Sequence, residues 1–109
     1  MHVNNIEEIV TNALKEAVVA AKNTVADSPT NWFPCGFAWV TIKPATGPLI
    51  KYLKENNIGA KANFGSGWVI YDPANTNAQR MDAKLAGARA FAKVINASGY
   101  DCSVSSRED

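Results

Sequence analysis

Histidine and cysteine are scarce in this sequence, which limits the metal and nucleophile chemistry that it can support. The 109 residues contain one histidine, His2, and two cysteines, Cys35 and Cys102, which stand far apart. A zinc site needs clustered Cys and His ligands, so we expect none. A cysteine nucleophile needs a base, and the single histidine lies at the N-terminal end. We therefore expect both thiols to be free and neither to be catalytic.

A strong charge of one sign and long hydrophobic runs are also lacking. The chain has 11 Lys and Arg against 10 Asp and Glu, a net charge of +1. This balance argues against a general nucleic-acid coat protein, which needs a strongly basic face. No apolar run approaches the roughly 20 residues of a membrane span, and the first residues do not read as a signal peptide. The expected location is the cytoplasm, with no membrane partner.

Sequence motifs of catalysis are missing as well. The chain has neither a Walker A sequence nor GxGxxG, and no carboxylate pair stands at a spacing that indicates acid and base roles. We therefore expect a protein that is not an enzyme and that carries no cofactor.

The pattern of apolar residues predicts one α+β domain over residues 1–109, with an N-terminal helix (1–27) and an α+β core (33–107). The expected elements are a helix at 5–26, a strand at 37–43, a short helix within 44–57 capped by Thr46, strands at 58–64 and 68–72, a helix at 78–98 and a strand at 100–104. After the first helix, this β-α-β-β-α-β order predicts a ferredoxin-like unit with a four-stranded antiparallel sheet. Gly99 is expected to end the long helix, and Gly87 within it predicts close backbone approach to the sheet or to a partner helix.

Strand alternation gives the predicted sheet one face without helices. Phe37 and Trp39 would lie there with Tyr71, and RNA-recognition domains of this topology stack bases on such aromatic residues. The alternative is that the first helix or a second subunit covers the rings, since aromatic residues supply core and interface area more often than base platforms. In the predicted hairpin, a three-residue turn at 65–67 places Phe64 opposite Trp68.

Two further groups of residues are candidates for anion binding. The loops after the first and third strands are expected at one edge of the sheet, where helix N-termini favour anions. These loops would bring together Lys43, Thr46, Gly47, Asn75, Thr76, Asn77 and Arg80. At the opposite edge, Arg107 at the end of the last strand would approach Trp32, Phe33 and Cys35. The alternatives are ordinary capping with solvated Lys and Arg, and a tail ion pair of Arg107 with Glu108 or Asp109. Arg89 belongs to a polar stripe of the long helix, for which a solvated face is the default.

Several blocks of the sequence resemble short accessory proteins encoded by tailed bacteriophages. The blocks are "PCGFAWV" (34–40), "YDPA" (71–74), "QRMDAKLAGARAFA" (79–92) and the terminal "SRED" (106–109). The resemblance covers residues 33–109 and implies a phage origin and hence the host cytoplasm, but brings no activity with it. The shared residues are Cys35, Gly36, Trp39, Asp82, Lys84, Gly87, Arg89 and Arg107. Phage proteins of this size often disarm a host enzyme or sequester a host signalling nucleotide.

The resulting hypothesis is a non-enzymatic, phage-type binding protein that captures a small nucleotide-like phosphorylated ligand and so evades host defence. The predicted ligand-binding residues are Phe33, Trp39, Lys43, Arg80, Arg89 and Arg107. The alternatives are an RNA- or single-strand-binding domain and a protein–protein inhibitor of a host enzyme. A homo-oligomer is expected, because the Ala/Val face of the first helix and the sheet aromatics exceed what one small domain needs to bury.

Overall fold

The computed structural model describes residues 5–27, 35–62, 65–75 and 80–108 of the chain. Its elements are α1 (Ile6–Asp27), β1 (Gly36–Lys43), α2 (Pro48–Glu55), β2 (Ala60–Lys61), β3 (Trp68–Tyr71), α3 (Met81–Ala97) and β4 (Asp101–Glu108). The strands form one antiparallel sheet in the order β2-β3-β1-β4. The predicted α+β class, with an N-terminal helix and a four-stranded antiparallel sheet, is confirmed.

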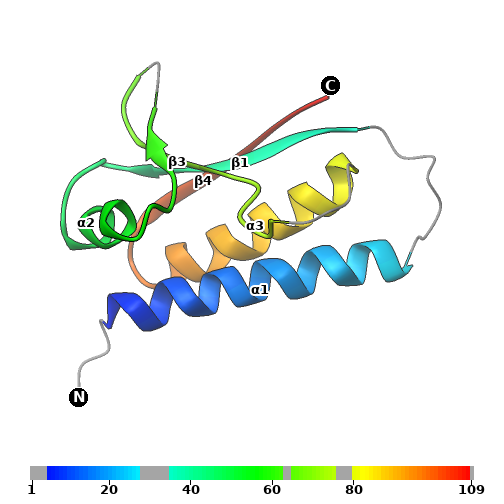
Figure 1. Ribbon diagram of the computed structural model, residues 1–109, viewed down its shortest axis with the longest axis horizontal. Helices are drawn as coiled ribbons and strands as arrows, with labels where there is room; N and C mark the ends of the chain where they lie inside the picture. The colour runs from blue at the N-terminus through cyan, green and yellow to red at the C-terminus, as the bar shows by residue number, and fades with distance from the viewer. Residues whose placement is uncertain (1–4, 28–34, 63–64, 76–79, 109) are drawn as a thin grey trace.

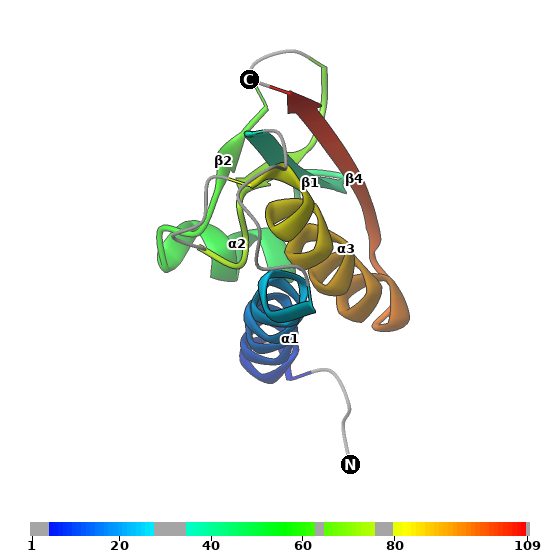
Figure 2. The same ribbon diagram turned by 90° about the vertical axis from the view of Figure 1, so that its right-hand side faces the viewer.

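All three helices lie on the same side of the sheet (Figures 1 and 2). Figure 2 shows α2 and α3 beneath the strands and α1 beneath those two helices. The buried side chains of β1 (Ala38, Val40 and Ile42) share one core with Phe91 and Ile95 of α3. Because α1 packs chiefly along α3, it does not cover the opposite face of the sheet. The alternative in which the first helix covers the sheet aromatics is therefore wrong.

Small residues let α1 and α3 approach closely. The buried side chains of α1 are Val10, Ala13, Ala17 and Ala21. A methyl group added at Gly87 of α3 would lie 2.7 Å from Cβ of Ala74 and 3.2 Å from the carbonyl oxygen of Ala17. The expected close approach at Gly87 is thus confirmed, and its neighbours are α1 and the segment that follows β3. The Ala/Val face of the first helix is buried in part: Val10, Ala13, Ala17 and Ala21 are buried within the chain, whereas Ile9, Leu14 and Val18 stay partly exposed. The expected homo-oligomer stays a prediction.

The helix ends follow local capping chemistry, with one correction. The backbone N–H of Glu8 donates to Oδ1 of Asn5 at 3.2 Å, which caps α1. Thr46 does not cap α2: the cap is Gly47, with φ of 99° and no side-chain bond, followed directly by Pro48. Gly99, with φ of 97°, follows the end of α3 as predicted.

Strand β4 is longer than its sequence pattern indicates. Alternation of apolar residues predicted a strand at 100–104, whereas β4 runs to Glu108 and pairs with every residue of β1. The last four residues of β4 are polar and exposed, so they carry no apolar signal. Backbone pairing with β1 extends the strand instead, and it places Arg107 directly opposite Phe37.

The β2–β3 hairpin has a different register from the predicted one. Trp68 is paired with Lys61, three residues before Phe64, which lies outside the described residues. The indole Nε1–H of Trp68 donates to the carbonyl oxygen of Ile58 at 2.8 Å and so anchors the start of β2. Gly59, with φ of 83°, passes so close that a Cβ there would lie 2.6 Å from that nitrogen. This anchor holds the segment before β2 at Trp68, and Ala60, rather than the predicted Asn63, pairs with Val69.

Candidate ligand-binding face

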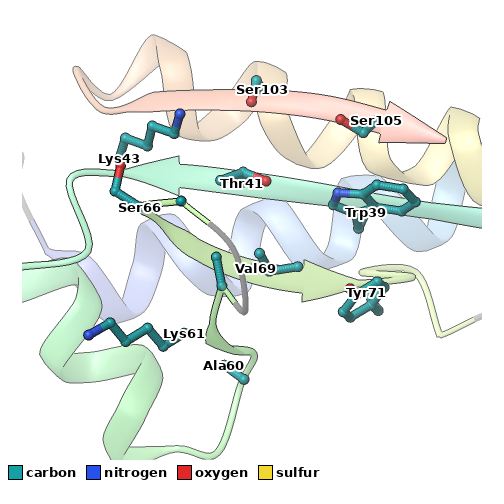
Figure 3. A pocket seen from close by; sticks show the side chains of 12 residues that line it. Trp39, Thr41, Lys43, Ala60, Lys61, Ser66, Val69, Tyr71, Ser103 and Ser105 are labelled. Carbon is teal, nitrogen blue, oxygen red and sulfur yellow. The ribbon is translucent and has the colours of Figure 1, made fainter.

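The side of the sheet away from the helices carries a continuous set of aromatic, hydroxyl and cationic side chains. We call it the open face; its central residues are Phe37, Trp39, Thr41 and Lys43 of β1, Val69 and Tyr71 of β3, and Ser103, Ser105 and Arg107 of β4. Figure 3 shows most of these side chains in front of the sheet, with the helices behind. Alternation along β1 places these residues opposite the buried Ala38, Val40 and Ile42.

One end of the open face is aromatic. Trp39 and Tyr71 are directly paired across β1 and β3, and their ring centroids lie 5.7 Å apart at an interplanar angle of 46°. Tyr71 is 65% exposed and Phe37 is 41% exposed. These three residues and Arg107 line a hollow of about 500 Å³, the aromatic hollow. Exposed aromatic faces of this kind are surfaces on which a planar ligand can stack.

Two cations stand beside the aromatic ring of Phe37. The guanidinium carbon of Arg107 lies 5.6 Å from the ring centroid, and Nζ of Lys84 lies 5.5 Å from it. The Lys84 ammonium also donates to the carbonyl oxygen of Gly36 at 3.0 Å, which holds it at the start of β1. The aromatic hollow therefore has positive charge at its margin, where an anionic group of a stacked ligand would be stabilised.

A second hollow, of about 590 Å³, lies further along the same face. We call it the lysine hollow, because Lys43 and Lys61 line it together with hydroxyls of Thr41, Ser66, Ser103 and Ser105. Figure 3 shows Lys43 and Lys61 at the end of the hollow away from the aromatic pair of Trp39 and Tyr71. Of the described residues that line either hollow, none is acidic. Asp101 of β4, which alternation places on this face, is paired with Lys43.

The structure brings together three of the predicted site residues. Trp39 and Arg107 line the aromatic hollow, and Trp39 and Lys43 line the lysine hollow. Arg107 approaches the start of the first strand as predicted, through its pairing with Phe37. Phe33 and Trp32 lie outside the described residues.

The predicted anion site at the loops after the first and third strands is wrong. Because β1 and β3 are antiparallel, the end of β3 lies beside the middle of β1 and Lys43 lies beyond the start of β3. Arg80 is near the other end of the sheet, where it forms an isolated β-bridge with Cys35. Lys43 and Arg80 therefore do not converge. Thr76 and Asn77 lie outside the described residues.

Arg80 and Arg89 are placed away from the open face. Arg80 is only 7% exposed and donates to both carboxylate oxygens of Asp82, from Nε at 3.0 Å and from Nη2 at 2.7 Å. These bonds hold the pKa of the Asp82 carboxyl below its usual value. Arg89 is exposed on α3, which packs on the opposite side of the sheet.

Sequence reasoning did not assign Lys84, Ser103 or Ser105 to the site. The two serines follow from the alternation of β4 once the strand is extended to Glu108. Lys84 carries no such signal, because its approach to Phe37 depends on how the first turn of α3 meets the start of β1.

The two cysteines lie in different environments. Cys35 is exposed, whereas Cys102 is buried on β4, and burial raises the pKa of its thiol to about 12. The side chain of Asn96 accepts from the backbone N–H of Cys102 and donates to its carbonyl oxygen, both at 2.8 Å. Cys102 is paired with Ile42, near the end of β1 opposite to Cys35, so a disulfide within one chain is not possible without backbone movement.

We expect a thiol reagent such as DTNB at pH 8 to modify Cys35 rapidly and Cys102 only after unfolding. The reason is that the reactive species is the thiolate, which burial disfavours at Cys102. The measurement is the number of thiols that react before and after addition of guanidinium chloride, with Cys35→Ser as the matched control. Rapid modification of the folded Cys35→Ser variant would contradict this assignment.

Within the part of the chain that the structure describes, no three His, Cys, Asp or Glu side chains gather as a metal site. No helix in those residues has the length and apolar character needed to cross a membrane. Comparisons with protein-family models, curated proteins and solved structures give no significant match.

Proposed function

We propose that this protein is a non-enzymatic nucleotide-binding protein and that its ligand stacks on the open face. The observation that carries the proposal is the uncovered aromatic hollow, where Trp39 and Tyr71 lie beside a cation-flanked Phe37. Stacking of a base on an aromatic side chain contributes about 1–3 kcal/mol and tolerates any base. Arg107 supplies a guanidinium fork that matches two oxygens of a phosphate group.

The charge distribution supports a ligand with few phosphate groups. A net charge of +1 gives no strong overall field, so attraction of an anion must come from individually placed cations. Arg107 lines the aromatic hollow, Lys84 lies beside the ring of Phe37, and Lys43 and Lys61 line the lysine hollow. The described lining residues include no His, Cys, Asp or Glu, which supports binding without thiol or carboxylate catalysis.

The proposal extends to fold and biological role. A ferredoxin-like arrangement is supported by the strand order β2-β3-β1-β4, with β1 antiparallel to both of its neighbours. The resemblance to tailed-phage accessory proteins supports sequestration of a host nucleotide, in the cytoplasm, as a means of evading host defence. Homo-oligomerisation remains part of the proposal and is supported by the partly exposed Leu14 and Val18 and the exposed Val19 of α1.

Thermal shift and calorimetry with a panel of mononucleotides test this function. A ligand present at 100 times its Kd stabilises the folded state by about 2.7 kcal/mol, so the melting temperature should rise. Arg107→Ala should weaken binding about ten- to a hundred-fold, because a charge-assisted hydrogen bond contributes roughly 1.5–3 kcal/mol. Arg89→Ala removes the same charge from the opposite side of the sheet and should leave affinity unchanged.

The proposal fails if neither mononucleotides nor longer nucleotides produce binding heat or a melting shift in the wild-type protein. The exposed Phe37 and Tyr71 would then indicate a protein-binding surface and the inhibitor alternative. Equal weakening by Arg107→Ala and Arg89→Ala would show that the ligand binds elsewhere.

A further inference from the structure

The two hollows of the open face are neighbours that share an aromatic wall. Trp39 and Tyr71 line both the aromatic hollow and the lysine hollow. Phe37 and Arg107 stand on one side of this pair, and Lys43 and Lys61 stand on the other. The paired rings therefore form a ridge with a separate space and separate cations on each side.

The dimensions of the face exceed those required by one nucleotide. Phe37 and Lys43 are six positions apart on one strand, which corresponds to about 20 Å at roughly 3.3 Å per residue. The hollows measure about 500 Å³ and about 590 Å³, and each alone lies within the usual range of a small-molecule site. A single base stacked beside Trp39 would leave the cations of the other hollow without a ligand group.

Resting on the proposed function, we propose that the ligand contains two nucleotide units joined by a phosphodiester, one in each hollow. The two units lie on opposite sides of the Trp39–Tyr71 ridge, so each unit contacts these two rings. Arg107 and Lys84 attract phosphate at one end, and Lys43 and Lys61 attract phosphate at the other. A single strand of nucleic acid and a cyclic dinucleotide share this chemistry.

The side chains between the two ends indicate weak base preference. The polar groups along the middle of the face are the hydroxyls of Thr41, Ser103 and Ser105. The described lining residues include no Asn, Gln, Asp or Glu, the side chains that read base edges with paired hydrogen bonds. Recognition therefore depends on stacking and on phosphate spacing.

The test is an affinity series measured by calorimetry. The probes are thymidine 5′-monophosphate, the linear dinucleotide pTpT, an eight-residue oligothymidylate, cyclic di-AMP and cyclic di-GMP. We expect at least one two-unit ligand to bind about ten-fold or more tightly than the mononucleotide, since it occupies the second hollow as well. If the octamer binds more tightly still than pTpT, the ligand is a single strand of nucleic acid. If a cyclic dinucleotide binds more tightly than pTpT, the ligand is a cyclic dinucleotide.

A double variant, Lys43→Ala with Lys61→Ala, isolates the lysine hollow. It should abolish the gain of the two-unit ligand, so that pTpT binds the variant no more tightly than thymidine 5′-monophosphate does. For a linear strand, the slope of log affinity against log salt should become shallower by about 0.7 for each phosphate that the variant no longer neutralises. The matched control is Lys15→Ala with Lys22→Ala, which removes the same charge from exposed positions of α1.

The outcomes distinguish failure of this inference from failure of the proposed function. If mononucleotides bind and no two-unit ligand binds more tightly, the inference is overturned and the proposed function stands. The inference is also overturned if the Lys43/Lys61 variant keeps the full gain, or if the Lys15/Lys22 control loses as much. If no nucleotide of any length binds, both proposals fall.

Discussion

Replacing Trp39 with alanine is expected to weaken nucleotide binding by about five- to a hundred-fold, because stacking on an aromatic residue contributes roughly 1–3 kcal/mol per base. Trp39 is paired with Tyr71 and lines both hollows of the open face. Its removal should therefore weaken a mononucleotide and a two-unit ligand alike. Calorimetry on the wild type and on Trp39→Ala, with both ligands, measures the effect.

Trp39→Phe is the matched control, because it keeps an aromatic ring at the same position. It should retain most of the affinity that Trp39→Ala loses. Trp39 is half-buried, so the melting temperature of each variant without ligand must be compared first. Undiminished binding by a folded Trp39→Ala variant would place the stacking surface elsewhere.

Gly87→Ala is expected to lower the free energy of unfolding by about 1–3 kcal/mol, the usual cost of overpacking a close contact. In an unconstrained helix the same change would stabilise by about 1 kcal/mol, because alanine has the higher helix propensity. Here the added methyl group would lie 2.7 Å from Cβ of Ala74 and 3.2 Å from the carbonyl oxygen of Ala17. Since the neighbours are packed core, we expect the steric cost to exceed the gain. Denaturant unfolding gives the value.

The contact with Ala74 can be isolated by a double-mutant cycle. Ala74→Gly removes the nearer of the two obstructing atoms, so Gly87→Ala should cost less in that background than in the wild type. The remaining loss of unfolding free energy would measure the steric contact with the α1 backbone at Ala17. If Gly87→Ala instead raises the free energy of unfolding by about the helix-propensity difference, the close packing of α1 against α3 is wrong.

Whether the open face of the sheet is exposed depends on the position of α1. Its sequence shows a stripe of Ala and Val at helical spacing, which is compatible with packing on the sheet, on another helix or on a second copy. The backbone of α1 at Ala17 approaches Gly87 of α3, and this close fit places α1 in the helix layer and not on the sheet (Figure 2). Consequently no helix among the described residues covers the aromatic side chains of β1 and β3, and Phe37 and Tyr71 are exposed.

Sequence patterns with a short period were sufficient to predict most individual helices and strands. Helical spacing predicted α1 and α3 to within a few residues, and Gly99 ended α3 because glycine adopts the left-handed conformation without strain. Alternation placed Phe37 and Trp39 on one side of β1, with Ala38 and Val40 on the other. Each of these features depends on residues near in sequence, so the pattern carries the necessary information.

Features that depend on contacts between distant segments were not accessible to the same reasoning. The polar end of β4 forms a strand because the backbone of β1 pairs with it, and the β2 register follows a hydrogen bond from Trp68 to Ile58. Antiparallel pairing of β1 and β3 separates Lys43 from Arg80, although the loops that carry these residues were expected at one edge of the sheet.

For the candidate site, the order of residues along β1 was enough to predict that aromatic residues share one face of the sheet, because a strand turns successive side chains to opposite sides. The packing of the folded chain was needed to establish that no described helix covers this face and that Lys84 and Arg107 flank Phe37. The physical reason is that backbone pairing and the packing of small residues act between segments far apart in sequence. A periodic pattern within one segment contains no information about such contacts.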